Sequence, residues 1–258
     1  MIHSTAIIHP TAKIGENVEI EPFVTIGENV EIGDGTVIMA KACIVKNVKM
    51  GKNNRIFHSA VIGSDPQDLK FAGEETFVEI GDNNTLREFV SVHRGTASRG
   101  KTVIGNGCLI MAYCHVAHDC VLQDNIIMSN AVQLAGEVEI DNFAILGGGA
   151  LLHQFSKIGK HVMIQGGALV NKDIPPFITA AREPISFAGI NIVGLRRRGF
   201  SNEQIADIQD IYRIIMLSGL NVTNAVQKVE AEFADTEIRA EILDFIKAST
   251  RGILNKVN

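Results

Sequence analysis

Apolar residues recur at every sixth position along most of the chain. From Ile2 to Ile62 every sixth residue is Ile except Met50, and the same phase returns from Ile104 to Val170. A second apolar or small residue follows most of these positions four residues later. Two inward-facing residues that flank one outward-facing residue make a very short β-strand.

A period of six leaves room for one short strand and one corner, where a Gly or Asn just beyond the strand can take a positive φ. Three such units make a coil of 18 residues. Stacked coils are joined by backbone hydrogen bonds between strands about 4.8 Å apart, and each coil needs its neighbours to bury its Ile row. The pattern therefore predicts a mainly β protein, with a parallel β-helix over residues 1–175.

Two stretches, at about residues 63–79 and 94–103, keep the phase of the repeat but lose its apolar character. The phase positions there are Asp68, Glu74 and Ser98. Loops that leave a solenoid often carry its binding face. We expect both stretches to be excursions from the coil, close to a functional site.

The repeat ends at Pro175 and Pro176, and residues 176–200 are predicted to connect it to a second region. From Ser201 the apolar spacing becomes three and four residues, which is typical of helices. Ser201 with Gln204 forms a capping-box signature, and Gly219 is predicted to end this first helix. Two further apolar stretches follow, so residues 201–258 are predicted to form an α-helical C-terminal domain.

Composition agrees with a narrow, repetitive interior. Hydrophobic residues make up 46% of the chain, but aromatic residues only 5%, with no Trp. Aromatic side chains usually dominate a thick core, so an ordinary α/β enzyme is disfavoured. A mean hydropathy of +0.15 is too high for a disordered chain. No apolar stretch approaches the roughly 18 residues of a membrane span, so we expect no transmembrane segment.

Charge and cysteine content indicate which partners and which cellular compartment to expect. A net charge of −5 argues against a nucleic-acid surface, which needs a basic patch. The four cysteines have no Cys-x-x-Cys spacing, and the N-terminus has no basic stretch followed by an apolar run. We expect a cytoplasmic protein without a metal.

The 18-residue coil places His118, Gly136 and Gln154 in one column, at steps of about 4.8 Å. A neutral His can take a hydroxyl proton near neutral pH, and a backbone N–H of Gly136 beside it can hold the oxyanion of an acyl-transfer intermediate. Asp119 can orient the ring. Adjacent polar residues are also common at corners, so spacing alone leaves an ordinary surface histidine as the alternative.

The repeat resembles the left-handed parallel β-helix of the hexapeptide-repeat acyltransferases, and handedness is expected from that resemblance alone. More specific strings are His93-Arg94-Gly95, His115-Val116-Ala117-His118-Asp119-Cys120, His153-Gln154-Phe155, Gln67-Asp68-Leu69-Lys70, Arg197-Arg198-Gly199-Phe200 and Ser249-Thr250-Arg251-Gly252. Over its whole length the chain resembles the UDP-N-acetylglucosamine O-acyltransferase family, which catalyses the first step of lipid A synthesis.

The resemblance implies a reaction and its partners. The family moves an R-3-hydroxyacyl chain from acyl carrier protein to the 3-hydroxyl of UDP-N-acetylglucosamine, with no cofactor besides the acyl thioester. Its catalytic His corresponds to His118, its assisting Asp to Asp119, and its oxyanion-binding N–H to Gly136. The other residues that match the family's substrate-binding positions are Gln67, Asp68, Lys70, His93, His115, His153, Gln154, Asn191, Arg197 and Arg198.

The family's site lies between adjacent subunits of a trimer, so a homotrimer is expected. Side chains near Gly166 limit the acyl chain in the family. Gly at this position leaves room and predicts a long chain, although Gln165 and Met163 can shorten the groove. Two residues depart from the family pattern: Glu137 stands where His is frequent, and Val193 replaces a nucleotide-contacting carboxylate.

Three other functions are kept as alternatives. The same base can serve a 3-amino UDP-sugar, which would make the reaction an N-acylation. A trimeric β-helix carbonic anhydrase would use three histidines to bind a metal, and His93, His115 and His118 supply enough imidazoles. However, His115 and His118 are three residues apart, whereas that family's pair is five apart. A non-catalytic β-helix scaffold would make the histidine column a coincidence.

Overall fold

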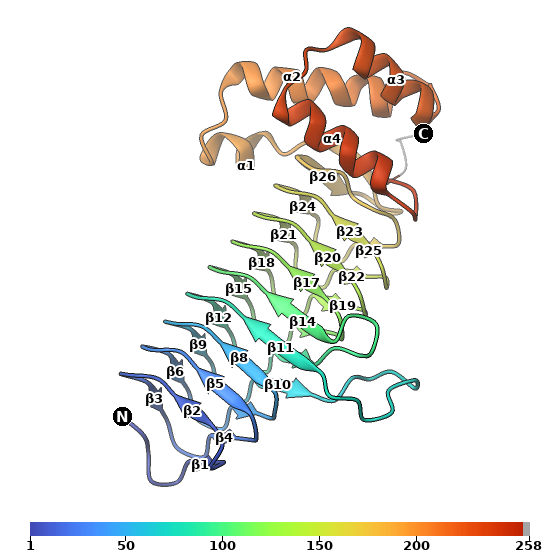
Figure 1. Cartoon of the computed structure of the whole chain (residues 1–258). Coiled ribbons are helices and arrows are strands. Elements are labelled where there is room, and N and C mark those ends of the chain that lie inside the picture. The colour runs from blue at the N-terminus through green and yellow to red at the C-terminus, as the bar shows by residue number, and fades with distance from the viewer. Residues whose placement is uncertain (255–258) are drawn as a thin grey trace.

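The computed structural model describes residues 1–254, which form a triangular β-helix capped by helices at its C-terminal end (Figure 1). Its coils carry three sheets, whose strands are parallel except for β27. Sheet A has ten strands, namely β3 (Glu19–Ile20), β6 (Val37–Ile38), β9 (Arg55–Ile56), β12 (Thr85–Leu86), β15 (Leu109–Ile110), β18 (Ile127–Met128), β21 (Ile145–Leu146), β24 (Met163–Ile164), β26 (Ile178–Ala181) and β27 (Ser186–Ile190).

The other two faces of the prism are sheets B and C. Sheet B has nine strands, namely β1 (Ile7–Ile8), β4 (Thr25–Ile26), β7 (Cys43–Ile44), β10 (Val61–Ser64), β13 (Ser91–His93), β16 (His115–Val116), β19 (Gln133–Leu134), β22 (Leu151–Leu152) and β25 (Leu169–Val170). Sheet C has eight, namely β2 (Lys13–Ile14), β5 (Val30–Ile32), β8 (Val48–Met50), β11 (Phe77–Ile80), β14 (Lys101–Ile104), β17 (Val121–Leu122), β20 (Glu139–Ile140) and β23 (Lys157–Ile158).

Strand register confirms the predicted 18-residue coil. Ile110 pairs with Met128, and Met128 pairs with Leu146. The phase residues between Ile20 and Val170 that lie on the coil are buried and form one continuous core. Ile2 is 53% exposed because no coil covers the first one.

The corners differ in one respect from the expected pattern. Positive φ occurs at the third residue after the phase position, for example at Asn17, Asn29 and Phe143. Among the glycines that follow the phase residues directly, Gly63 adopts it, with a φ of +86°, and the others do not. They are required by close approach, since a Cβ on Gly33 would collide with the backbone of Gly51 in the next coil.

The two excursions are shorter than the sequence indicates. The first comprises residues 65–76 between β10 and β11, because β10 runs to Ser64 and β11 begins at Phe77. The second comprises residues 94–100 between β13 and β14. These are called excursion 1 and excursion 2 below. Both leave the coil at the corner between sheets B and C.

The coil also extends beyond residue 175. Strand β26 pairs in parallel with β24 and then turns back antiparallel as β27. The segment 176–200, expected to be a simple connection, therefore contains this hairpin and helix α1 (Ile192–Arg197).

The predicted helical C-terminal region is confirmed. It consists of α2 (Asn202–Tyr212), a π-helical turn η1 (Arg213–Leu217), α3 (Val222–Glu232) and α4 (Glu237–Ala248). Ser201 and Gln204 form the expected capping box, and Gly219 has a φ of +78°. Residues 255–258 of the predicted helical domain lie outside the described residues.

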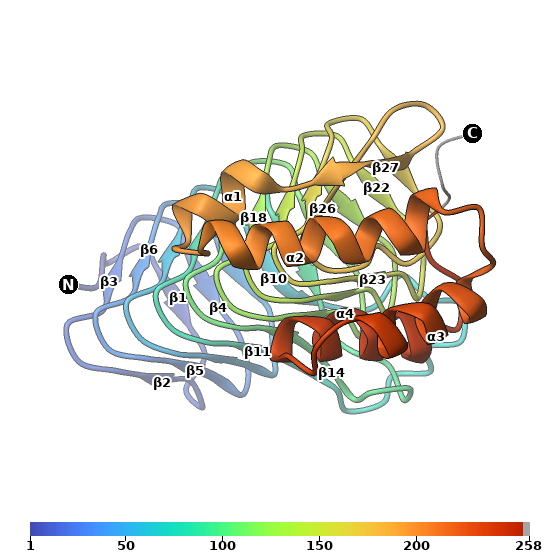
Figure 2. The same ribbon diagram turned by 90° about the horizontal axis from the view of Figure 1, so that it is seen from above.

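The helices cover the last coil and close its apolar end (Figure 2). The buried Tyr212 hydroxyl donates to Pro176 O at 2.6 Å. Ser249 Oγ donates to Asp173 Oδ2 at 2.6 Å, and Arg251 donates to Asn171 O. The Ser249–Gly252 string thus fastens the tail to the coil. No helix within residues 1–254 is long and apolar enough to cross a membrane.

Candidate active site

His118 lies at the corner between sheets B and C, just after β16. It is 7% exposed, and its Nδ1 lies 2.8 Å from Oδ2 of Asp119. Asp119 has a φ of +60°, the corner conformation, which turns its carboxylate back toward the preceding ring. An imidazole held through Nδ1 presents Nε2 outward, where no residue among 1–254 hydrogen-bonds it.

The Asp119 carboxylate is fully buried and receives several hydrogen bonds from excursion 2. The Thr96 N–H donates to Oδ1 at 2.9 Å and to Oδ2 at 3.0 Å, and the Thr96 hydroxyl donates to Oδ2 at 2.7 Å. The Arg99 N–H donates to Oδ1 at 3.2 Å. The Thr102 hydroxyl accepts the Asp119 N–H at 2.9 Å. The carboxylate is therefore rigidly placed.

Gly136 lies one coil beyond His118, as the column predicts. Glu137 N donates to His118 O at 3.0 Å, and Phe155 N donates to Gly136 O at 3.1 Å, so Gln154 follows in the same column. A Cβ on Gly136 would stand 2.5 Å from both Cε1 and Nε2 of His118. Within residues 1–254 the Gly136 N–H donates no hydrogen bond, and it stays free for a ligand.

Two further histidines stand beside His118. His93 and His115 contact each other edge to face, with ring centroids 4.8 Å apart, and Ser91 Oγ lies 2.8 Å from His115 Nδ1. Burial, with smaller contributions from His115 and His118, lowers the pKa of His93 to about 4. Burial and the His118 charge also lower the pKa of His115. His93 is thus uncharged at neutral pH.

Excursion 1 brings Asp68 to the same corner. Its Oδ2 lies 4.0 Å from His118 Nε2. The Lys70 N–H donates to Asp68 Oδ1 at 2.9 Å, and the side chains of Gln67 and Lys70 are exposed. All three breaks in the apolar register contribute here, since Glu74 accepts from Ala97 N in excursion 2 and Ser98 N donates to Thr96.

The buried side chain of Arg94, at the start of excursion 2, contacts excursion 1. It is 1% exposed, forms an ion pair with Asp65, and lies over the Phe71 ring at 5.8 Å from the centroid. Both partners are in excursion 1. The Arg94 N–H also donates to Ser64 O.

His153 lies one coil beyond Gly136 and is exposed, with its Nδ1 3.0 Å from Gln154 O. Glu137, the departure from the family pattern, faces excursion 2, where one carboxylate oxygen lies 3.8 Å from Arg99 Nε. Arg99 also forms an ion pair with Glu139. The Glu137 carboxylate is therefore engaged within the chain.

The predicted nucleotide-binding residues lie at a different corner, between sheets C and A. Asn191 caps α1 and donates to His161 O at 2.9 Å. The Arg198 guanidinium lies 4.5 Å from the Phe143 ring centroid and is exposed, as are Arg197 and Val193. One chain does not bring this group together with His118.

The residues predicted to limit the acyl chain lie at the third corner, between sheets A and B. A Cβ on Gly166 would stand 3.1 Å from Gly148 O. Gln165 accepts from Arg182 N at 3.1 Å, and Met163 faces outward on β24. The three groups of candidate residues thus occupy the three corners of the prism.

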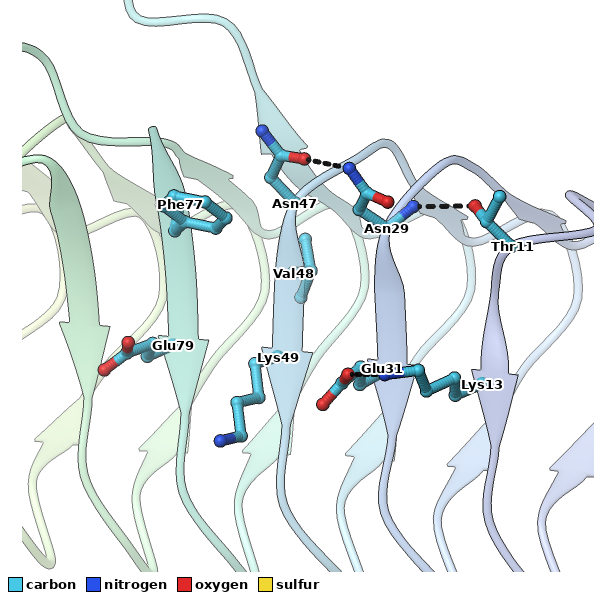
Figure 3. A pocket seen from close by; sticks show the side chains of 9 residues that line it. All are labelled: Thr11, Lys13, Asn29, Glu31, Asn47, Val48, Lys49, Phe77 and Glu79. Carbon is cyan, nitrogen blue, oxygen red and sulfur yellow. Dashed lines mark hydrogen bonds and ion pairs between the residues drawn. The ribbon is translucent and has the colours of Figure 1, made fainter. Parts of the chain in front are cut away.

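No group of three or more His, Cys, Asp or Glu side chains in residues 1–254 has the arrangement of a metal site. A hollow of about 460 Å³ does lie on the outer face of sheet C, near the N-terminus. Figure 3 shows that its wall alternates in charge, with Lys13 and Glu31 in an ion pair at 2.6 Å and Lys49 beyond. None of the candidate residues lines it.

Thr96, Arg99 and Thr102 are the site residues that sequence reasoning missed. They lie in or beside excursion 2, where the 18-residue arithmetic does not apply. Thr85 pairs with Leu109, 24 residues on, so excursion 2 adds one repeat length. Applying this longer step would have placed Thr96 near the corner that carries Asp119.

Family models match three parts of the chain. "Udp N-acetylglucosamine O-acyltransferase; Domain 2" covers residues 173–254. "Bacterial transferase hexapeptide (six repeats)" covers residues 101–136, and "GMPPB C-terminal domain" covers residues 2–70.

Curated relatives match almost end to end. An O-acyltransferase from Janthinobacterium sp. (strain Marseille), named for acyl carrier protein and UDP-N-acetylglucosamine, is 46% identical over 98% of this chain and 99% of its own length. An enzyme of the same name from Myxococcus xanthus (strain DK1622) is 44% identical, with 98% of both chains covered.

Solved structures agree with the fold. A UDP-N-acetylglucosamine acyltransferase from Bacteroides fragilis 9343 superposes with a TM-score of 0.97 at 54% identity, covering 99% of this chain and 100% of its own. One from Francisella novicida superposes with a TM-score of 0.97 at 41% identity, covering 100% of this chain and 95% of its own. The predicted left-handed hexapeptide β-helix is confirmed by these matches.

Proposed function

Since the chain belongs to the UDP-N-acetylglucosamine O-acyltransferase family, we propose that His118, Asp119 and Gly136 carry out its reaction. The enzyme is an acyltransferase of the first step of lipid A biosynthesis, which moves an R-3-hydroxyacyl chain from acyl carrier protein to the 3-hydroxyl of UDP-N-acetylglucosamine. The observation that carries the proposal is that, within residues 1–254, neither His118 Nε2 nor the neighbouring N–H of Gly136 has a hydrogen-bond partner.

His118 Nε2 takes the proton of the sugar 3-hydroxyl as its oxygen attacks the thioester carbonyl. The carbonyl oxygen becomes an oxyanion, which accepts the Gly136 N–H. Collapse of this intermediate breaks the C–S bond, and the imidazolium returns its proton to the departing thiolate of acyl carrier protein. Asp119 holds Nδ1–H throughout and stabilises the charged ring, because their hydrogen bond is 2.8 Å long.

The surrounding polar residues are proposed to bind substrate. Asp68 is suited to a sugar hydroxyl beside His118 Nε2, since its carboxylate stands 4.0 Å away. Lys70 and Gln67 extend from the same excursion. His93 and His115 have lowered pKa values, chiefly because they are buried, and so add no positive charge near the base. His153 and Gln154 continue the binding surface along the column.

Arg197, Arg198 and Asn191 are proposed to bind the nucleotide of a substrate held at His118 of a second copy. Two adjacent guanidinium groups suit a diphosphate. Within one chain, however, sheet C separates Arg198 from His118. A closed trimer of prisms resolves this, because it can set the sheet C–sheet A corner of one copy against the sheet B–sheet C corner of the next.

A long acyl chain is proposed because Gly166 leaves its corner free of a side chain. Gln165 is turned toward the backbone of Arg182, while Met163 faces outward and sets the width of the groove. The reaction needs no cofactor besides the acyl carrier protein thioester. We place it in the cytoplasm. Family membership leaves the carbonic anhydrase and scaffold alternatives without support.

The test is an acyl-transfer assay with the purified full chain, hydroxyacyl carrier proteins of graded length, and either UDP-N-acetylglucosamine or its 3-amino analogue. We expect a 3-O-ester as the main product and faster transfer of long chains. A higher kcat/KM for the amino sugar would instead establish N-acylation, and a preference for short chains would refute the role of Gly166. No transfer to either sugar would contradict the proposed function.

A further inference from the structure

Excursion 2 is fastened at both ends and holds Thr96 against the catalytic corner. The Gly100 N–H donates to Thr96 O at 2.7 Å, which closes a tight turn over residues 96–100. The Arg99 side chain is anchored by Glu139 and Glu137 on the coil. Gly95 lies so close to Lys101 that a Cβ would collide with its backbone N. Thr96 is therefore a fixed group, 8% exposed, rather than part of a mobile loop.

The direction of the Thr96 hydroxyl proton follows from its two partners. Its oxygen accepts the Ser98 N–H at 3.2 Å, and its only other partner within residues 1–254, Asp119 Oδ2, stands at 2.7 Å. A carboxylate accepts and does not donate. The hydroxyl must therefore donate to Asp119, and to the same oxygen that binds His118 Nδ1.

The Asp119 carboxylate thus faces four donors, three of which belong to excursion 2. They are the N–H and O–H of Thr96, the N–H of Arg99 and the Nδ1–H of His118. A protonated carboxyl group would direct its own hydrogen at one of these donors, so the arrangement fits the ionised form only. Donation by Thr96 also draws charge from Oδ2 and moderates its attraction for a protonated His118.

We propose that Thr96 is a positioning residue, whose hydroxyl donates to Asp119, aims Oδ2 at His118 Nδ1 and moderates the attraction between this oxygen and a protonated His118. This rests on the proposed role of His118 as the general base. Neither family membership nor the histidine column assigns this role. Thr96 touches neither the acyl donor nor the sugar in the proposed mechanism, and it acts only through Asp119.

Other charged or titratable groups also face the His118–Asp119 pair and must stay unchanged in a test. They are Asp68 of excursion 1, His93 of β13, His115 of β16, Arg99 of excursion 2, and Glu137 and Cys120 at the same corner. A substitution confined to the Thr96 hydroxyl leaves all of them in place.

The test compares Thr96→Val, Thr96→Ser and wild-type full-length enzyme by the pH dependence of kcat and kcat/KM. Valine keeps the shape and the backbone N–H but removes the hydroxyl. Oδ2 then attracts the imidazolium more strongly, so we expect the acidic limb of kcat/KM to move up by about half a pH unit. We also expect kcat to fall by about tenfold, because Asp119 is less well held. Serine restores the hydroxyl and should match the wild type.

Ser98→Ala is the matched control, because Ser98 reaches Thr96 through its backbone N–H and its side chain is exposed. Its profile should match the wild type. If Thr96→Val does not fold, Thr96→Ala removes the same hydroxyl without adding a buried methyl. An acidic limb that stays in place or moves to lower pH in the hydroxyl-free variant overturns the role of Thr96. Absence of transfer by the wild-type enzyme, in contrast, overturns the proposed function.

Discussion

At the residue scale, the corner that carries His118 needs a glycine at position 136, because a Cβ there would collide with the His118 ring. The column of His118 and Gly136 was predictable because the coil length is constant from Ile104 onward. The support of Asp119 by Thr96 was not predictable in this way, because excursion 2 lengthens one coil and shifts its residues off the column. Regular spacing therefore located His118 and Gly136, but not the groups that hold the Asp119 carboxylate in place.

Gly136→Ala tests the close approach between the two coils. The added Cβ would stand 2.5 Å from His118 Nε2, so the imidazole must turn out of line with the acceptor hydroxyl. We expect kcat to fall by about a hundredfold while KM for the sugar nucleotide changes little. The wild-type enzyme is the reference, and an unchanged kcat in Gly136→Ala would show that His118 tolerates the displacement.

At the scale of elements, the repeat predicted the strands, and its three breaks marked the parts that build the site. The breaks were expected to leave the coil for substrate. The structure shows that Asp68 approaches His118, whereas Glu74 and Ser98 stabilise the excursions themselves. Corner glycines were assigned a positive φ because local pattern shows only that a small residue is needed. Only the fold shows that close contact with the next coil, and not a positive φ, requires glycine at most of these positions.

Arg94→Met tests whether Arg94 holds excursion 1 in place. Methionine keeps much of the buried volume but loses the ion pair with Asp65 and the contact with the Phe71 ring. We expect faster amide hydrogen exchange in residues 65–76 and about tenfold lower kcat/KM, because Asp68 is less well placed. Exchange in the coil strands should stay slow. If residues 65–76 exchange as in the wild type, Arg94 does not restrain the excursion.

At the scale of the whole molecule, the prism separates its candidate residues among three corners, and the helices only close its end. From the sequence, resemblance predicts that Arg198 binds the nucleotide and that Gly166 leaves room for the acyl chain. It does not show that sheets separate both residues from His118. This separation follows from the triangular section of the coil. The proposed mechanism therefore needs a second copy of the chain, which the proposed trimer would supply.

Mixed trimers test the shared site. If each site combines His118 of one subunit with Arg198 of the next, His118→Ala and Arg198→Ala chains repair one another when co-expressed. Random assembly of equal amounts leaves about a quarter of the sites with both residues intact. We expect about a quarter of wild-type activity from the tagged mixture, well above either variant alone. Activity no greater than the average of the two variants would place both residues in a single subunit's site.

The stability of the fold should also depend on pH. Burial, with the nearby Arg198 and Lys160 charges, lowers the pKa of His161 to about 4, and the pKa of His93 is lowered to a similar value. Between this value and the ordinary 6.5, the unfolded chain binds more protons than the folded one. The contribution of these two histidines to the free energy of unfolding is therefore complete above about pH 6.5 and is lost as the pH falls toward about 4.

His161→Phe isolates one of these two histidines. Phe143 and Phe177 adopt the same positive φ and stack on either side of His161, so another Phe ring fits this corner. The buried Nδ1 of His161 has no partner to lose within residues 1–254. We expect Tm to fall less between about pH 7 and about pH 5 than in the wild type. Substitution of the exposed His9 by Gln should leave the fall unchanged, and an equal fall in His161→Phe would contradict the assignment.

The most direct measurement of the central claim is the kcat/KM of His118→Ala for hydroxyacyl transfer to UDP-N-acetylglucosamine, with Tm measured on the same sample. Loss of the general base should lower kcat/KM by at least about a hundredfold while Tm is retained. An intact His118→Ala enzyme with wild-type kcat/KM would contradict catalysis by this histidine.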